Sequence, residues 1–339
     1  MTLSDALNLY KLPYNITSTT TAGGFTSYTL AAAGSSATLA RLQARLQDIN
    51  AATGEQYEII QNAAGLSLRS RNGHQAFYNY SDFNGYINEN DSKIPFIVGF
   101  NSYGGIILDN LNDARHILIA GTTGSGKSVF LHNLIFTFCC NPHTNIYLVD
   151  CKKVELSMYD PRCYVVSDVF GERSAARLTA DFCRIIDNRY NDMLLCGVND
   201  FEEYRKIRPD AKRNILVIDE LADLINDKQS RKVIIPRLLR IAQIGRAAGC
   251  HLILATQRPD HTIINGTLKG NIPTRLAFNC ISNTDSRVIL DRGGAEHLTG
   301  NGDGLYLKNG ALSLERIQAP YIDLNMIKDK ITEYKLRTA

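Results

Sequence analysis

The chain has 339 residues and a formal net charge of +3, so it is long enough for one large and one smaller domain, and it carries no globally cationic surface. Its eight cysteines form no Cys-x-x-Cys pair and no zinc-like spacing with histidine, which indicates a reducing cytoplasm and excludes a zinc site of that kind. The N-terminus lacks the pattern of a signal peptide, and no apolar run approaches the roughly 18 residues of a membrane span. A membrane span is therefore not expected, whereas a membrane or docking partner stays open.

The first 92 residues have the pattern of a small α+β domain. A Ser/Thr/Gly-rich segment precedes an alternating stretch, a helical stretch and two strand-like pieces. These pieces are residues 16–24, 25–33, 37–54, 57–62 and 66–70. Proline and glycine residues then mark the approach to a second domain, which we expect to begin at residue 93.

The second domain, residues 93–320, alternates short apolar runs with helical segments. This alternation predicts an α/β fold in which helices cover both faces of a mostly parallel sheet. Residues 321–339 have the spacing of an exposed amphipathic C-terminal helix.

Residues 121–128, GTTGSGKS, match the phosphate-binding loop pattern G-x-x-x-x-G-K-[S/T]. An apolar run at 117–120 and a helical stretch at 129–138 predict the strand and the helix that such a loop needs, because free backbone N–H groups at the helix start bind phosphate. Lys127 would reach the β- and γ-phosphates of ATP, and Ser128 would hold Mg²⁺. The predicted nucleotide-binding residues are Gly121, Thr122, Thr123, Gly124, Ser125, Gly126, Lys127, Ser128 and Val129.

Two acids, Asp219 and Glu220, follow the apolar run at 215–218. An acidic pair after a strand can be the start of a solvated loop. Downstream of a phosphate-binding loop, we interpret Asp219 as a group that acts on the Mg²⁺ and Glu220 as the group that orients or deprotonates the attacking water. No metal site other than this one is expected.

Residues 246–259, RAAGCHLILATQRP, predict a helix that ends at Gly249, then a buried strand with Gln257 at its tip. Gln257 could sense the γ-phosphate through its amide. Arg246 could complete the site of a neighbouring subunit, or it could be a surface arginine favoured by the helix dipole, and spacing alone does not choose. The basic run that ends at Arg213 lies in a polar connection and is most simply a solvated face.

Seven segments together resemble the FtsK/SpoIIIE family of DNA translocases, and the resemblance is collinear from about residue 94 to residue 310. They are GTTGSGKS, VDCKKVELSMY (149–159), VIDELADL (217–224), RAAGCHLILATQRP, LKGNIPTRLAF (268–278), TDSRVILD (284–291) and GAEHLTGNGDGLY (294–306). The resemblance implies a RecA-like P-loop ATPase core in a hexameric ring that passes double-stranded DNA through its channel. It further implies that Glu220 is the catalytic glutamate, Gln257 the sensor and Arg246 a trans-acting arginine.

The same resemblance places Arg258 and Lys269 on pore loops that contact the DNA backbone, whereas a third basic position of the family is Asn283 here. We expect no counterpart of the membrane domain and the winged-helix domain of the cell-division members, and the divergent first 90 residues favour a phage or mobile-element source. We therefore expect an ATP-driven double-stranded DNA translocase. The alternatives are a conjugative coupling or packaging ATPase, a type VII-secretion-like ATPase that moves polypeptides, and a nucleotide-binding scaffold without turnover.

Overall fold

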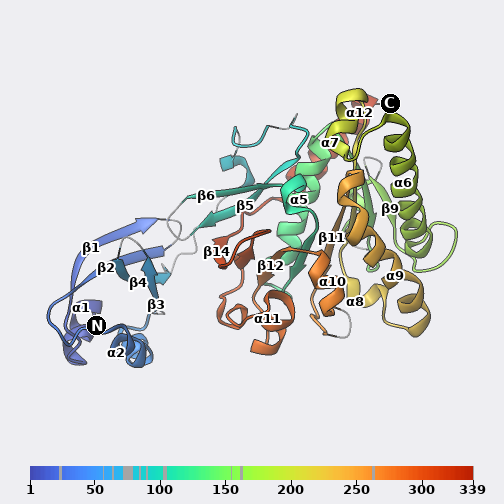
Figure 1. Cartoon of the computed structure of the whole chain (residues 1–339). Coiled ribbons are helices and arrows are strands. Elements are labelled where there is room, and N and C mark those ends of the chain that lie inside the picture. Colours follow the sequence, from blue (N-terminus) through green and yellow to red (C-terminus); the bar gives the residue numbers. More distant parts are fainter. Residues whose placement is uncertain are drawn as a thin grey trace. The chain divides into compact units, whose positions relative to one another are not determined.

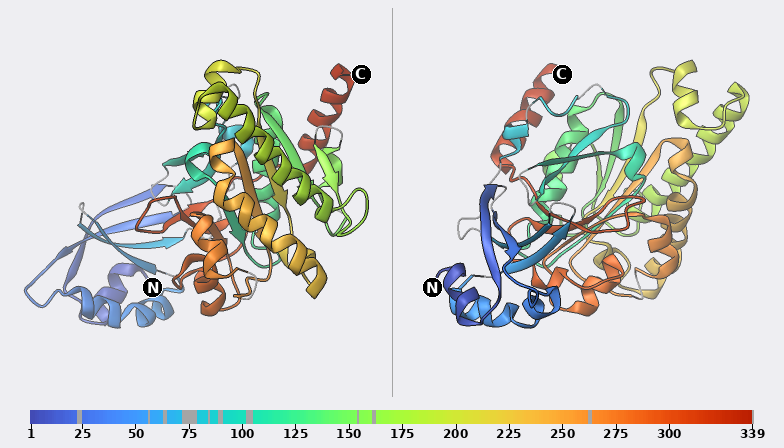
Figure 2. Two further views of the ribbon diagram at one scale, coloured as in Figure 1. Left: turned by 45° about the vertical axis from the view of Figure 1, so that its right-hand side comes forward. Right: turned by 60° about the vertical axis from the view of Figure 1, so that its left-hand side comes forward.

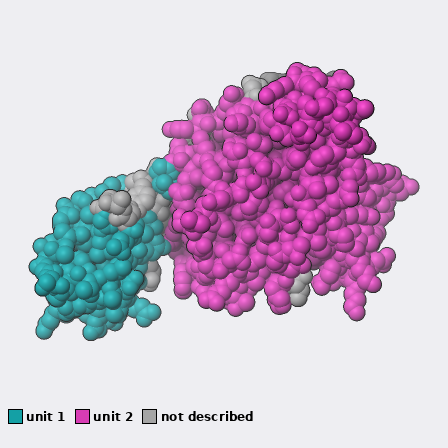
Figure 3. Space-filling model, viewed as in Figure 1, with its two compact units in different colours: residues 1–77, 100–105 teal, residues 78–99, 106–339 magenta. Residues whose placement is uncertain are grey.

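The computed structural model describes residues 1–22, 25–55, 57–62, 65–71, 79–83, 85–88, 91–101, 105–153, 155–160, 163–261 and 264–338. They divide into two compact units, one of Met1–Phe77 with Phe100–Gly105 and the other of Tyr78–Gly99 with Ile106–Ala339 (Figure 3). The second unit begins at Tyr78, earlier in the chain than the domain boundary expected at residue 93, because Tyr80 is hydrogen-bonded within the second unit. The Tyr80 hydroxyl lies 2.8 Å from Thr137 Oγ1, and its backbone N–H donates to the carbonyl of Tyr321.

The first unit is an antiparallel four-stranded sheet with three helices. Its strands lie in the order β1-β2-β4-β3. The single helix expected over 37–54 is instead two short helices separated at Arg45. The first begins after Thr38, and the second ends before Gly54. The elements are α1 (Leu3–Leu9), β1 (Tyr14–Ala22), β2 (Phe25–Ala32), α2 (Leu39–Ala44), α3 (Leu46–Thr53), β3 (Tyr57–Asn62) and β4 (Gly65–Arg71).

The second unit contains a ten-stranded sheet in the order β6-β5-β14-β13-β12-β7-β11-β10-β8-β9 (Figure 1). The six strands from β12 to β9 are parallel to one another, whereas β13 pairs antiparallel with β12 and β14 pairs antiparallel with β13. The predicted mostly parallel sheet is thus confirmed. The strands are β5 (Pro95–Asn101), β6 (Ile106–Asn110), β7 (Ile117–Ala120), β8 (Thr144–Val149), β9 (Tyr164–Val166), β10 (Arg213–Ile218), β11 (Cys250–Thr256), β12 (Thr274–Phe278), β13 (Asp303–Leu307) and β14 (Glu315–Gln318).

Helices cover both faces of this sheet. All four residues of β7 are apolar because each of them is buried on one face or the other. Ile117 and Ile119 pack on the face that carries α5 and α12, whereas Leu118 and Ala120 pack on the face that carries α6, α9 and α11. Helices α6 and α9 lie side by side over that second face (Figures 1 and 2). The helices are α4 (Leu111–Ala114), α5 (Lys127–Cys140), α6 (Ala175–Cys196), α7 (Phe201–Ile207), α8 (Leu221–Leu224), α9 (Lys228–Ile244), α10 (Gly266–Asn271), α11 (Asn283–Leu290) and α12 (Leu324–Thr338).

The C-terminal helix α12 is more than the exposed helix expected from its sequence. Ile327 is fully buried and Ile331 is nearly so, and both belong to the core cluster that also contains α5. The apolar stripe of α12 is therefore part of the second unit's core. Within the described part of the chain, no helix is long and apolar enough to cross a membrane.

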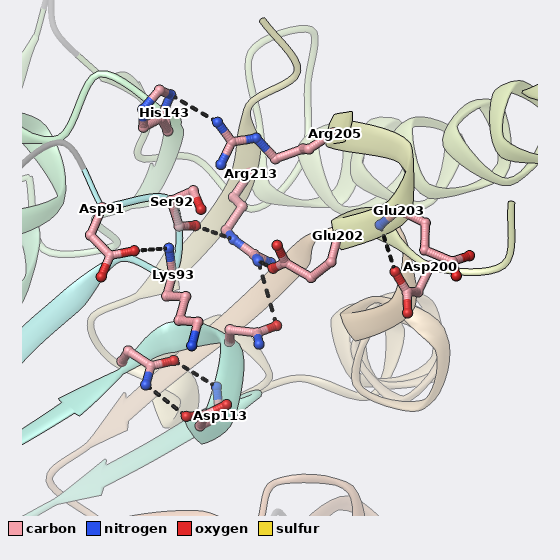
Figure 4. A network of polar contacts seen from close by, with 12 residues as sticks. Asp91, Ser92, Lys93, Asp113, His143, Asp200, Glu202, Glu203, Arg205 and Arg213 are labelled. Atoms are coloured by element: carbon pink, nitrogen blue, oxygen red, sulfur yellow. Dashed lines mark hydrogen bonds and ion pairs between the residues drawn. The ribbon is translucent and has the colours of Figure 1, made fainter. Parts of the chain in front are cut away.

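The interpretation of the basic run as a solvated face is wrong for Arg213, because only 1% of this residue is exposed, whereas Lys206, Arg208 and Lys212 are exposed as expected. The Arg213 guanidinium pairs with Glu202 and donates to the Ser92 carbonyl over 2.9 Å (Figure 4). It donates to His251 Nε2 over 3.1 Å as well. It also lies over the ring of Phe201. Burial and the neighbouring charge of Arg213 lower the pKa of His251 well below its usual value, so His251 is neutral and can accept this hydrogen bond. Arg213 thus ties the start of β10 to α7 and to the segment that precedes β5.

We expect Arg213→Met to lower the free energy of unfolding by about 3 kcal/mol, because the buried His251 and the partly buried Ser92 carbonyl and Glu202 carboxylate lose their donor and the methionine cannot replace it. Chemical denaturation of the two proteins measures this difference. Lys206→Met is the matched control, since Lys206 belongs to the same basic run but is exposed. Equal stability of the Arg213 variant and the control would contradict the structural role of Arg213.

Candidate nucleotide-binding site

The residues of the candidate site lie at the carboxyl ends of five neighbouring parallel strands. These ends meet at one edge of the sheet because β7 lies between β11 and β12, with β10 and β8 beyond β11. The residues that follow the strands are Gly121 after β7, Asp150 after β8, Asp219 after β10, Gln257 after β11 and Asn279 after β12. This edge is where open parallel sheets bind their ligands.

The phosphate-binding loop connects β7 directly to α5, as its sequence predicted. Gly124 and Gly126 have φ angles of 78° and 103°, in the left-handed region that favours glycine. Thr122 N–H donates to the Asn279 carbonyl over 2.9 Å, and Ser125 N–H donates to the Thr122 carbonyl over 3.1 Å. The loop is therefore held by its own turn and by the end of β12, and it precedes the free N–H groups of the first turn of α5.

A second loop, residues 299–302, supports the phosphate-binding loop from the side. Gly302 N–H donates to the Ser125 carbonyl over 2.8 Å, and Asn301 N–H donates to the Gly124 carbonyl over 3.2 Å. A Cβ atom on Gly126 would lie 2.4 Å from the nitrogen of Gly302, so a side chain at Gly126 would displace one of the two loops. The segment that provides this support was noted only as part of a family motif.

Lys127 and Asp219 come together as expected of a phosphate-binding lysine and an acid at the metal. Only 2% of either side chain is exposed, and Lys127 Nζ lies 3.3 Å from the Asp219 carbonyl oxygen and 3.4 Å from its Oδ1. Ser128 follows in the first turn of α5 and is partly buried. The hydroxyl of Ser128 and the carboxylate of Asp219 are hard oxygen donors of the kind that Mg²⁺ prefers, so these residues fit the ion.

Glu220 is buried, with 3% of the residue exposed, and both of its carboxylate oxygens accept hydrogen bonds from the tip of β11. The Thr256 hydroxyl donates to Oε1 over 2.6 Å, and the Gln257 N–H donates to Oε2 over 2.9 Å. The ammonium of Lys152 lies 3.9 Å from Oε2. These contacts hold the carboxylate at the same strand edge as the phosphate-binding loop.

Gln257 and Thr123 are also in contact. The Thr123 hydroxyl donates to Gln257 Oε1 over 3.1 Å, so the side chain at the tip of β11 reaches the phosphate-binding loop. A γ-phosphate bound at that loop would compete for these two polar groups. This position suits the sensor role that the resemblance implied for Gln257.

Arg246 lies at the other edge of the sheet and does not join the site of its own chain. It is exposed and belongs to a short 3₁₀ turn (Arg246–Ala248) that precedes the amino end of β11. The carboxyl end of β11 carries Thr256, and a strand of this length separates its two ends by about 20 Å. Arg246 therefore does not reach a nucleotide bound at the carboxyl edge of its own chain, and the nucleotide that it could contact would lie on another chain.

The residues expected to contact DNA differ in their surroundings. Arg258 is exposed directly after β11, and its side chain makes no polar contact among the residues that the structure describes. Lys269 lies on α10, and its ammonium pairs with Asp291 Oδ1 over 2.5 Å, while Arg275 pairs with the other oxygen of Asp291. Asn283 begins α11 and donates to Glu296 Oε1 over 2.6 Å. Arg258 is thus available to a phosphate, whereas Lys269 is engaged within the chain.

Sequence reasoning did not single out Lys152, Thr256, Asn279 or Asp150. The Asp150 carboxylate is fully buried and accepts the N–H groups of Lys153 and Leu156, so it shapes the loop that presents Lys152 to Glu220. Each of these residues except Asn279 lies inside a segment that resembles the family. That position was the available signal, but it did not indicate which residues meet.

This sheet, its loop-to-helix connection and the acids on the neighbouring strand define a P-loop ATPase fold of the RecA-like class. The family model that describes the FtsK/SpoIIIE family matches residues 84–261, more than half of the chain. The chain is 36% identical over 258 residues to DNA translocase FtsK of Tropheryma whipplei, which covers 71% of this chain and 34% of the relative. It is likewise 36% identical to DNA translocase SpoIIIE of Bacillus subtilis strain 168 over 68% of this chain and 31% of the relative. The chain therefore belongs to the FtsK/SpoIIIE family, and it spans about a third of the length of these relatives.

Two solved structures confirm the fold. One is the monomer form of the pCW3 conjugation coupling protein TcpA with ATPγS, which has a TM-score of 0.71 and 24% identity and matches 97% of both chains. The other is the cytoplasmic domain of the type VII secretion ATPase EccC of Thermomonospora curvata, with a TM-score of 0.62 and 21% identity over 73% of this chain and 32% of that one. At these identities, the likeness concerns the fold alone.

Proposed function

We propose that the chain is an ATP-driven double-stranded DNA translocase that works as a hexameric ring in the cytoplasm. The observation that carries this proposal is the division of the site between the two edges of the sheet. Lys127, Asp219 and Glu220 meet at the carboxyl edge, whereas Arg246 stands at the amino edge. A ring in which the amino edge of one subunit meets the carboxyl edge of the next completes every site.

In such a completed site, each residue contributes to a different part of ATP hydrolysis. The phosphate-binding loop and Lys127 hold the phosphates, and Ser128 and Asp219 would hold Mg²⁺, which neutralises charge on the β- and γ-phosphates when it is bound. Glu220 orients the attacking water and accepts its proton, and Gln257 contacts the γ-phosphate. Arg246 of the neighbouring subunit stabilises the charge that develops in the transition state.

The DNA part of the proposal is supported by the relatives, whose names describe DNA translocases, and by Arg258 at the tip of β11. A motor that moves along any sequence must contact phosphates, because base edges carry sequence information. The likeness to a conjugation coupling protein and to a secretion ATPase supports a second candidate, a motor with the same engine and another cargo.

The ATPase rate in the presence of linear duplex DNA tests the cargo. Single-stranded DNA and no DNA are the comparisons, at two salt concentrations. Stimulation by duplex that weakens with salt is the expected result, because phosphate contacts release counterions. Hydrolysis that is indifferent to DNA would overturn the DNA proposal and favour a polypeptide cargo. Electron microscopy of the protein with ATPγS tests the hexameric ring.

We expect Asp291→Asn to strengthen DNA binding, because it frees Lys269 from its ion pair. One additional phosphate contact per subunit should steepen the logarithmic salt dependence of binding by about one per subunit. Titration of labelled duplex at several salt concentrations measures this slope. Asp187→Asn, which breaks the Arg240 pair between α6 and α9, is the matched control and should leave the slope unchanged. A slope equal to that of the wild type for Asp291→Asn would show that Lys269 does not face DNA.

A further inference from the structure

The hydroxyl of Thr256 lies between Glu220 and Arg258. It is 2.6 Å from Glu220 Oε1 and 3.2 Å from the carbonyl oxygen of Arg258, and it accepts the Arg258 N–H over 3.1 Å. Thr256 itself is fully buried at the end of β11. One side chain therefore touches both the residue that would activate water and the backbone of the residue that would touch DNA.

A threonine hydroxyl has a single hydrogen, so it cannot donate to both oxygens at once. In this structure the shorter contact is with the carboxylate, and hydrogen bonds to ionised acceptors are the shorter and stronger kind. The hydrogen is therefore given to Glu220, and the Arg258 carbonyl oxygen is the second acceptor within reach. The two acceptors compete for one donor, which creates two alternative arrangements of the β11 tip.

The two arrangements differ in how many hydrogen bonds the carboxylate oxygens of Glu220 accept. When Thr256 and the Gln257 N–H both donate to the carboxylate, each oxygen is engaged and fewer of its lone pairs are left to accept a hydrogen bond from water. When the hydroxyl turns to the Arg258 carbonyl, Oε1 loses its shortest hydrogen bond. The Gln257 N–H still holds Oε2 over 2.9 Å and contacts Oε1 over 3.2 Å, so the carboxylate stays in place while the lone pair of Oε1 that Thr256 occupied becomes available to water.

We propose that Thr256 is a positioning residue that couples DNA contact at Arg258 to Glu220. A phosphate that draws Arg258 toward the DNA moves its backbone and favours the hydrogen bond from Thr256 to the Arg258 carbonyl, which releases Glu220 Oε1. Without DNA, the hydroxyl restrains the carboxylate. The proposal rests on the proposed DNA translocase function and adds the route by which DNA would raise ATP turnover.

The test compares Thr256→Val with the wild type, with duplex DNA and without it. Valine keeps the shape of threonine and removes the hydroxyl, so the restraint on Glu220 is lost. We expect turnover without DNA to rise about fivefold, the effect of one hydrogen bond, and the stimulation by DNA to fall by the same factor. The KM for ATP should stay within about twofold, because Thr256 contacts the phosphate-binding loop through its backbone carbonyl, which accepts the Gly121 N–H over 3.3 Å and is kept in the variant. Thr256→Ser keeps the hydroxyl and should restore the wild-type stimulation ratio.

Thr274→Val is the matched control. Thr274 is also fully buried and begins β12, which is separated from β11 by β7, and its hydroxyl donates to the Ala114 carbonyl, away from Glu220. It should leave the stimulation ratio unchanged. If Thr256→Val does not fold, as judged by circular dichroism, Thr256→Ala replaces it, since the smaller side chain cannot overpack the site.

Two results would overturn the coupling. The first is an unchanged stimulation ratio in the valine or alanine variant, including an equal loss of the basal and stimulated rates, since it would reduce Thr256 to a structural role. The second is a failure of Thr256→Ser to restore the ratio. A wild-type protein that duplex DNA does not stimulate would instead refute the proposed function, so the two failures are distinguishable.

Discussion

Exchanging Glu220 for glutamine is expected to lower ATP turnover by a factor of about 10²–10⁴, the usual contribution of a general base. The glutamine amide keeps the size of the side chain and can still accept the Thr256 hydroxyl hydrogen, so the local structure should persist. It cannot take a proton from water. Single-turnover hydrolysis of ATP measures the loss, and binding of a fluorescent ATP analogue should remain close to that of the wild type.

Asp223→Asn is the matched control for this prediction. Asp223 lies three residues further along, within α8, and is exposed, so loss of its charge tests the acidic environment without touching the candidate base. The control should hydrolyse ATP at nearly the wild-type rate. Turnover by Glu220→Gln within a fewfold of that control would show that another group activates the water.

Removing the side chain of Arg246 is the second substitution with a large expected effect. A trans-acting arginine contributes about 10³–10⁵ to phosphoryl transfer, so Arg246→Ala should hydrolyse ATP at close to the background rate. Its affinity for ATP should be nearly unchanged, because Arg246 stands at the opposite edge of the sheet from the nucleotide of its own chain. Equilibrium binding and steady-state ATPase assays measure the two quantities separately.

Mixing two inactive variants decides whether Arg246 acts between subunits. Arg246→Ala retains an intact phosphate-binding loop, and Lys127→Ala retains an intact Arg246. Where an Arg246→Ala subunit receives the arginine of a Lys127→Ala neighbour, one complete site forms. We expect part of the activity to return in the mixture. A mixture as inactive as its two components would contradict a shared site.

The local chemistry of the nucleotide site could be predicted from the sequence because it depends on residues that are adjacent in the chain. The loop between β7 and α5 needs its glycines and Lys127 within eight positions, and Asp219 and Glu220 need only to follow a buried strand. The alternation of apolar runs and helices likewise indicated a mostly parallel sheet. These features are short-range, so one segment contains the whole signal.

Contacts between segments far apart in the chain were decided by the order of the strands. Placing β11 between β7 and β10 brings Thr256 and Gln257 to Glu220, and no spacing in the sequence indicates that meeting. The end of α11 likewise gives Lys269 an acidic partner, Asp291, whereas the resemblance placed Lys269 on a pore loop that contacts DNA.

The sequence by itself thus indicated the family, the phosphate-binding loop and the two acids that follow β10. Only the tertiary structure decided that Arg213 is a buried tie, that Arg246 stands at the opposite edge of the sheet and that one threonine hydroxyl serves both Glu220 and Arg258. The physical reason is that burial and hydrogen-bond partners depend on which strands become neighbours. A local pattern of residue types specifies a strand or a turn, but it does not specify the neighbour on either side.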